Sequence, residues 1–168
     1  LKANPASLSR RIHLKKVALG ATFGGYACMV MEKTNAAATS VGVTSIDKSC
    51  IDAAPITTID RIVNETWPYD RVNSIDIVKM DIEGYELFAM GGAKHLLKNL
   101  RPKLFITEFV PWRMKAFGVK DPVEEFLSVF YKNGYIVKDA IAKETLFTLS
   151  AAIVYFNDKG QDYFTDLQ

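Results

Sequence analysis

The stretch Ser74-Ile-Asp-Ile-Val-Lys-Met-Asp-Ile-Glu-Gly84 determines the fold that we expect for this chain. Residues 74–80 form a compact apolar run, which is typical of a buried strand in a parallel sheet. Asp81 and Glu83 follow at alternate positions, and Gly84 lets the backbone turn tightly before a helical pattern begins. Ligands of open parallel sheets bind just outside the carboxyl ends of the strands, and buried carboxylates are costly unless they are paired. The spacing alone predicts either a functional site or caps for the next helix.

Downstream of this stretch, apolar periodicity and turn residues predict alternating helices and strands. Residues 87–100 have a helical pattern, which Gly91-Gly92 should divide into two helices. Asp121-Pro122 begins a further helix, with proline at its first position, and Asn133-Gly134 ends it. The expected strands are 103–109, 135–138 and 146–156, of which the last two should form a hairpin. This order of elements is that of an α/β domain.

Upstream, the elements are shorter and the signals weaker. Residues 12–19 form an apolar stretch, and Gly24-Gly25 precedes an expected strand at 26–32. The range 34–55 is rich in Ala, Ser and Thr, and we expect it to be an exposed excursion. A short helix should begin near Thr58 or Asp60.

The bulk composition indicates one globular domain of 168 residues, with 49% hydrophobic and 24% charged residues. The net charge of +2 is too even to argue for nucleic-acid binding, which normally requires a concentrated basic face. The basic cluster of Arg10, Arg11, Lys15 and Lys16 is interpreted as a solvated edge. No apolar run reaches the roughly 20 residues that span a bilayer, so we expect no membrane segment.

The two cysteines, Cys28 and Cys50, lack the spacing of a zinc site and are too few for a disulfide scaffold. They therefore predict a reducing compartment, and we expect a cytoplasmic protein. The sequence contains no signal peptide. Because it opens with Leu1, we expect the native N-terminus, with any targeting signal, to lie upstream. His13 and His95 have no partner at helical spacing, so neither is interpreted as a metal ligand.

Three segments resemble the FkbM-type methyltransferases. Residues 78–93 are similar to the family signature, in which an acidic strand end is followed by a second glutamate and a glycine-alanine pair. Residues 101–108 resemble the family's next strand, which ends on a glutamate, and residues 57–60 resemble the start of the preceding helix. The resemblance extends over residues 12–156. The signature positions that match are Lys79, Asp81, Glu83, Gly84, Glu86, Gly92 and Ala93.

The resemblance implies a Rossmann-like class I methyltransferase sheet with an antiparallel last strand. The strand ending at Asp81 should lie parallel to, and beside, the strand ending at Glu108. The implied activity is methyl transfer from S-adenosylmethionine to a hydroxyl of a sugar or polyketide-like small molecule. The rival interpretation is a truncated, non-catalytic scaffold or interaction domain with the same fold.

The resemblance also implies which residues form the site. Transfer to a hydroxyl needs a base, and three acids at adjacent strand ends could instead hold Mg²⁺, which would lower the pKa of the hydroxyl. The sequence does not choose between these two roles. The candidate catalytic residues are Asp81, Glu83 and Glu108, the candidate substrate-binding residues are Lys79 and Trp112, and the candidate cofactor-binding residues are Asp81 and Ala18.

One part of the family pattern has no counterpart in this sequence. The family holds its cofactor with an acidic strand end before a glycine-rich turn, and with a second strand whose terminal acid binds the ribose. Gly20 to Gly25 lacks the preceding acid and is interpreted as a turn. We therefore expect residues 1–168 to form a single partial domain, incomplete at its N-terminus, that binds S-adenosylmethionine weakly. The strand ending at Asp81 should then be an exposed edge, which invites aggregation, homodimer formation or coverage by residues 26–32.

Overall fold

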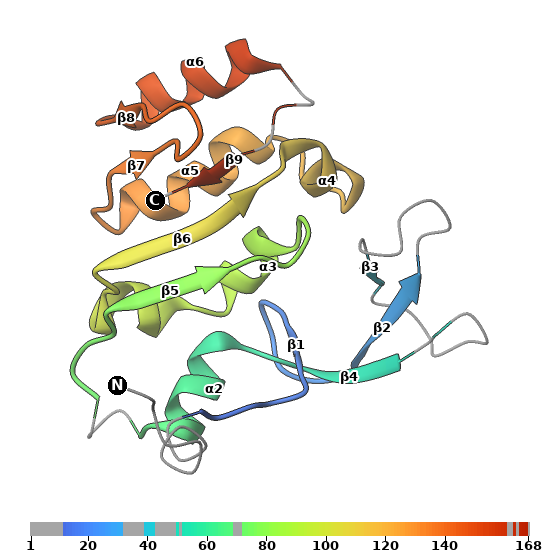
Figure 1. The fold of residues 1–168 in the computed structure, drawn as a ribbon. Coiled ribbons are helices and arrows are strands. Elements are labelled where there is room, and N and C mark those ends of the chain that lie inside the picture. The colour runs from blue at the N-terminus through green and yellow to red at the C-terminus, as the bar shows by residue number, and fades with distance from the viewer. Residues whose placement is uncertain are drawn as a thin grey trace, which may run out of the picture.

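A computed structural model describes residues 12–31, 39–42, 50, 52–68, 72–160, 163 and 165–167 (Figure 1). In these residues the strands form three small sheets with helices packed against them. The first sheet has the order β1 (Ala18–Leu19), β4 (Asp52–Thr57), β2 (Tyr26–Met31) and β3 (Thr39–Gly42). Strand β1 runs parallel to β4, whereas β2 is antiparallel to both β3 and β4. Parts of the expected excursion at 34–55 are therefore strands, and the Gly20–Gly25 segment is the turn between β1 and β2.

The second sheet carries the acidic strand ends. Its order is β5 (Ile77–Met80), β6 (Leu104–Phe109) and β9 (Thr165–Leu167). Strands β5 and β6 are parallel, with Ile77 opposite Leu104 and Met80 opposite Thr107, and β9 is antiparallel to β6. The expected parallel pairing of the strands that end at Asp81 and Glu108 is thus confirmed. Both acids consequently lie at one end of the sheet, on the side of the β5 and β6 arrow tips in Figure 1.

Strand β5 is the edge of this sheet. Among the described residues it pairs with β6 alone, and the side chain of Ile77 is 60% exposed. The exposed edge expected for the strand that ends at Asp81 is therefore present, since β5 has a neighbouring strand on one side only within the described part of the chain. The expectation that residues 26–32 cover this edge is wrong, since β2 pairs with β3 and β4.

Most of the expected helices are present. Helix α2 (Ile59–Thr66) begins after Thr58, whose hydroxyl accepts a hydrogen bond from the Arg61 N–H. Gly91-Gly92 divides the next helical segment into α3 (Glu86–Gly91) and a π-helix, η1 (Leu96–Leu100). Helix α4 (Pro111–Ala116) follows β6, and α5 (Pro122–Lys132) begins and ends where its sequence predicts.

The prediction of a strand at residues 146–156 is wrong. Strands β7 (Val137–Lys138) and β8 (Thr145–Leu146) form a two-residue antiparallel pair, and helix α6 (Leu149–Lys159) follows. The hydroxyl of Thr148 accepts a hydrogen bond from the N–H of Ala151 at 3.2 Å and so caps this helix. Ala152 and Phe156, one helical turn apart, are buried on one face. An apolar run of this length fits a strand or a buried helix, and packing of α6 on α5 selects the helix.

Aromatic side chains from β6, α5 and α6 fill the core beside this sheet. The ring centroids of Phe109 and Phe126 are 5.3 Å apart, those of Phe126 and Phe130 are 5.2 Å apart, and those of Phe109 and Phe156 are 5.1 Å apart. Each of these four side chains is at most 4% exposed. This packing holds β6 against two helices, and therefore fixes the strand that carries Glu108.

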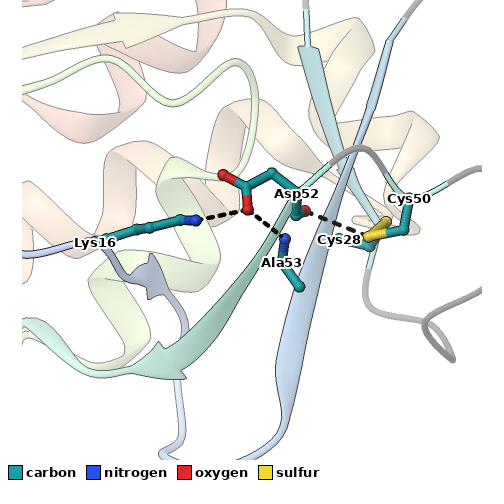
Figure 2. Close-up of a disulfide and its surroundings, with 5 residues drawn as sticks. All are labelled: Lys16, Cys28, Cys50, Asp52 and Ala53. Carbon is teal, nitrogen blue, oxygen red and sulfur yellow. Dashed lines mark hydrogen bonds and ion pairs between the residues drawn. A yellow bond between two sulfur atoms is a disulfide. The ribbon is translucent and has the colours of Figure 1, made fainter.

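A disulfide joins Cys28 on β2 to Cys50, just before β4 (Figure 2). The cysteine count did not predict this bond. Antiparallel pairing of β2 with β4 brings together residues that are 22 positions apart, which the count could not reveal. Nearby, the Lys16 ammonium donates to Asp52 Oδ1 at 2.6 Å.

The expected basic edge is described only in part. Lys15 and Lys16 form exposed ion pairs with Glu65 and Asp52, whereas Arg10 and Arg11 lie outside the described residues. Among the helices that the structure describes, none has the length and apolar character needed to cross a bilayer.

Candidate functional site

Three carboxylates meet at the carboxyl end of β5 and β6. One carboxylate oxygen from each of Asp81, Glu83 and Glu108 lies within 4.8 Å of the other two. Asp81 directly follows β5, and Glu108 is the next-to-last residue of β6. We refer to these three residues as the acid cluster. The parallel register explains their meeting, because it places both strand ends at the same edge of the sheet.

Two cations accompany the acid cluster. The Lys79 ammonium donates to Asp81 Oδ2 at 3.0 Å, and the Arg113 guanidinium of α4 forms an ion pair with Glu83. Lys79 and Asp81 are exposed, whereas Arg113 and Glu83 are partly buried. Lys79, a candidate substrate-binding residue in the sequence, thus pairs with Asp81 in the structure. Arg113 had no signal in the sequence, because it comes from an element that follows β6.

The backbone between Asp81 and α3 is unusual. Glu83 has a φ of 61° and Gly84 a φ of 94°, both in the left-handed region. A Cβ atom at Gly84 would lie only 2.5 Å from the Arg113 Cβ, so glycine is required for α4 to approach. A non-glycine residue held at positive φ often marks a functional site. Here the turn places the carboxylate of Glu83 beside Asp81 and Arg113.

Glu86, the second glutamate of the signature, supports this turn from inside. It is fully buried, and its Oε1 accepts a hydrogen bond from the Ile82 N–H at 2.9 Å. Burial raises the pKa of Glu86, although hydrogen bonds from backbone N–H groups oppose this. Its role is therefore to hold residues 82–86 in place rather than to face a ligand.

Asp60 and Gly92 fix the other side of the turn. Asp60 accepts hydrogen bonds from the N–H groups of His95 and Leu96 at 2.8 and 2.9 Å, and its own N–H donates to Gly92 O. A Cβ at Gly92 would lie 2.3 Å from the carbonyl oxygen of Gly20. These contacts give structural reasons for Asp60 and Gly92 in the family pattern.

An apolar groove of about 590 Å³ runs along the free edge of β5. Strand β1 contributes Leu19 to it, while Ser74 and Lys79 are the polar side chains among its described lining. The apolar lining residues are Ile59, Ile62, Val63 and Trp67 of the α2 region, Val72, Ile75, Ile77, Val78 and Met80 of the β5 region, and Leu96. The groove therefore ends, through Lys79 and Met80, next to Asp81.

The other expected site residues lie apart from the acid cluster. Ala18 is on β1, opposite Ile56 of β4, and is half-buried. Trp112 is on α4 and 46% exposed, and it lines a separate hollow of about 310 Å³. The Arg113 guanidinium lies 5.2 Å from the centroid of the Trp112 ring, so this one residue touches both Trp112 and the acid cluster.

Comparison with known proteins identifies the family. The profile of the Methyltransferase FkbM domain matches residues 12–137, which contain β1 to β6, the acid cluster and both signature glycines. No curated protein and no solved structure matches the chain at a significant level. The profile covers most of the chain and includes each segment on which the resemblance rests. The chain therefore belongs to the FkbM methyltransferase family.

Proposed function

We propose that the protein is an O-methyltransferase that uses S-adenosylmethionine and acts on a hydroxyl of a sugar or polyketide-like small molecule. Family membership makes the chain a methyltransferase with a Rossmann-like fold, and implies S-adenosylmethionine as the methyl donor. The observation that carries the proposal is the acid cluster, whose three carboxylates lie within 4.8 Å of one another where β5 and β6 end. Parallel sheets bind their ligands at this position.

The reaction needs a base and a precise approach. S-adenosylmethionine, when bound, supplies an electrophilic methyl group on a positively charged sulfur that departs as a neutral thioether. The acid cluster takes up the hydroxyl proton as the new carbon–oxygen bond forms and the carbon–sulfur bond breaks. Lys79 and Arg113 hold Asp81 and Glu83 in position. Alignment of the hydroxyl with the methyl group supplies a large part of the rate.

The groove along β5 supports a place for part of the cofactor. Its apolar lining suits the adenosyl group, and the negative charge of Asp81 at its end suits the positive sulfur. Ala18 lies next to the lining residue Leu19, which keeps it a candidate contact. The polar side chains described in the groove, Ser74 and Lys79, do not include a carboxylate for the ribose hydroxyls. We therefore propose weak binding of S-adenosylmethionine by this chain alone, and calorimetry measures it.

A divalent cation such as Mg²⁺ is the alternative occupant of the acid cluster. Three carboxylates at this separation are a ligand set that hard cations accept. Two of the three already pair with Lys79 and Arg113, which favours a carboxylate base. Turnover unchanged by a chelator supports the base, and turnover that is lost with the chelator and restored by Mg²⁺ supports the cation.

The decisive experiment replaces Asp81 by Asn and follows transfer of a labelled methyl group to a panel of sugar and polyketide hydroxyls. We expect Asp81→Asn to lower turnover by about 10²–10⁴-fold, the usual contribution of a general base. The matched control is Asp76→Asn, because Asp76 precedes the same strand and forms an exposed ion pair with Lys103. The control should keep both its turnover and its unfolding temperature.

Two results would contradict the proposal. Equal turnover of Asp81→Asn and Asp76→Asn would return Asp81 to a structural role. Absence of methyl transfer to every acceptor, with the fold intact, would favour the rival function of a non-catalytic scaffold or interaction domain.

The free edge of β5 also supports a homodimer. Among the described residues, β5 has a strand neighbour on one side only, and the exposed Ile77 lies on this edge, where a second copy could extend the sheet. Sedimentation of the parent and of Ile77→Lys measures this. We expect the parent to dimerise and the lysine variant to be monomeric, and a monomeric parent would contradict the dimer.

A further inference from the structure

The hollow beside Trp112 is built from three helices. Helix α4 supplies Trp112 and Lys115, the segment leading into α5 supplies Lys120 and Asp121, and α6 supplies Asn157 near its end. Figure 1 shows α4 and the end of α6 on the same side of the molecule as the arrow tips of β5 and β6. The volume of about 310 Å³ is at the lower end of the range of small-molecule sites, roughly 300–1,000 Å³, and suits one sugar ring with a substituent.

The walls of the hollow combine three kinds of chemistry. The indole of Trp112 is 46% exposed and offers a flat apolar surface on which the C–H face of a sugar ring can stack. Lys115 and Lys120 are exposed, and neither forms an ion pair with any residue that the structure describes. The Asp121 carboxylate can accept hydrogen bonds from hydroxyl groups, and the Asn157 amide can both donate and accept them. The two lysines outnumber the one acid of the lining, Asp121, which favours an anion, and the remaining groups favour a ring that carries hydroxyls.

Arg113 connects this hollow to the acid cluster. Its guanidinium pairs with Glu83 and lies 5.2 Å from the centroid of the Trp112 ring. The side chain of Arg113 therefore lies between Trp112, which lines the hollow, and Glu83 of the acid cluster. This arrangement separates recognition of the acceptor, on α4, from the proton transfer at the strand ends.

We infer that the hollow is the acceptor subsite and takes a hexose that carries an anionic group, either a carboxylate or a phosphate. The inference rests on the proposed function and narrows its substrate class. Trp112 stacks on the ring, and Lys115 and Lys120 pair with the anionic group. Asp121 and Asn157 bind ring hydroxyls.

Binding can be measured separately from methyl transfer. The only other tryptophan, Trp67, is replaced by Phe, so that the fluorescence of Trp112 reports on the hollow. This protein is titrated with D-glucuronate, glucose 6-phosphate, D-glucose and inorganic phosphate. We expect a saturable change with one or both charged sugars, and binding at least about tenfold weaker for glucose and for phosphate alone. The preferred charged sugar then distinguishes carboxylate from phosphate.

Variants test the individual walls. Lys115→Ala and Lys120→Ala should each weaken binding of the charged sugar by about tenfold. Trp112→Ala should abolish binding, which is measured by calorimetry because this variant lacks the fluorescent side chain. Lys98→Ala is the matched control, because Lys98 is an exposed lysine on η1 that does not line the hollow. It should bind like the parent, and unfolding curves verify that each variant is folded.

Several outcomes would overturn the inference. They are glucose binding as tightly as the charged sugars, phosphate binding as tightly as glucose 6-phosphate, and no saturable change with any probe. Methyl transfer with a KM unaffected by Trp112→Ala would also overturn it. Charged-sugar binding without any methyl transfer would instead contradict the proposed function and leave the hollow as a binding site.

Discussion

Replacement of Asp139 by Asn should destabilise the end of the chain more than any other isosteric change that we consider. Asp139 is fully buried, and its carboxylate accepts hydrogen bonds from the Tyr155, Tyr163 and Thr165 hydroxyls at 3.0, 2.7 and 2.7 Å. Two backbone N–H groups of the following turn also donate to it at 3.0 Å. The carboxylate thus ties the β7–β8 connection to α6 and to β9.

The size of the effect follows from these bonds. Oδ2 accepts from Tyr155 and Tyr163, and in Asp139→Asn an NH₂ group takes the place of one oxygen while the charge is lost. Hydrogen bonds to a charged group contribute about 1.5–3 kcal/mol each, so two of them account for about 3–6 kcal/mol. The tyrosine hydroxyls can accept hydrogen bonds from the new amide group, which offsets part of this loss. We therefore expect Asp139→Asn to lower the free energy of unfolding by about 3 kcal/mol. A typical domain has only about 5–15 kcal/mol of stability.

The same network has a pH signature. Burial alone would raise the pKa of Asp139, but hydrogen bonds from Tyr163, Thr165, Ala142 and Tyr155 outweigh it and hold the pKa below its usual 3.8. The contribution to stability is therefore complete above pH 3.8 and is lost as the pH falls through the lower pKa of the folded state. The Asn variant cannot show this loss.

Urea unfolding at a series of pH values tests both effects, and hydrogen exchange of β9 tests whether the loss is local. The matched control is Asp158→Asn, an exposed acid near the end of α6, which should unfold like the parent. An Asp139→Asn variant that unfolds at the same urea concentration as the parent, with the same acid dependence, would refute the reasoning.

Three further changes test the turn that supports the acid cluster and the first sheet. Gly92→Ala places a Cβ against the Gly20 carbonyl oxygen, so we expect the free energy of unfolding, measured in urea, to fall by about 1–3 kcal/mol or more. An unchanged midpoint of urea unfolding would contradict this contact. Burial raises the pKa of Glu86 above 4.5, so the parent should lose stability as the pH rises from 4.5 to that pKa. The Glu86→Gln variant should not show this loss. Parallel curves of unfolding free energy against pH for the two proteins would contradict the prediction. Cys28→Ser opens the bridge to Cys50 and should cost about 3 kcal/mol, with intact mass after alkylation of the parent verifying that the bond forms.

The sequence was most informative where a pattern is local. The apolar run of β5 with its two terminal acids, the start and end of α5, and the break at Gly91-Gly92 all depend on neighbours within a few residues. Parallel pairing of β5 and β6 followed from two strands with similar acidic ends, so the meeting of Asp81 with Glu108 was also expected. The family could be identified because its signature lies in this same segment.

The sequence was misleading where a pattern fits two structures. Residues 149–156 are apolar enough for a strand, and only packing against α5 makes them a helix. The count of two cysteines gave no sign of the disulfide, which depends on the register of β2 with β4. The network around Asp139 has no sequence signal, because its partners come from α6 and β9.

By itself, the sequence determined the α/β class, the family and the acids at the ends of two neighbouring strands. The tertiary structure alone decided that Arg113 pairs with Glu83 and that Trp112 faces a separate hollow. The physical reason is the range of the interactions. Turn glycines, caps and strand ends are set by residues close in sequence, whereas ion pairs and hollows need helices to pack across many intervening residues.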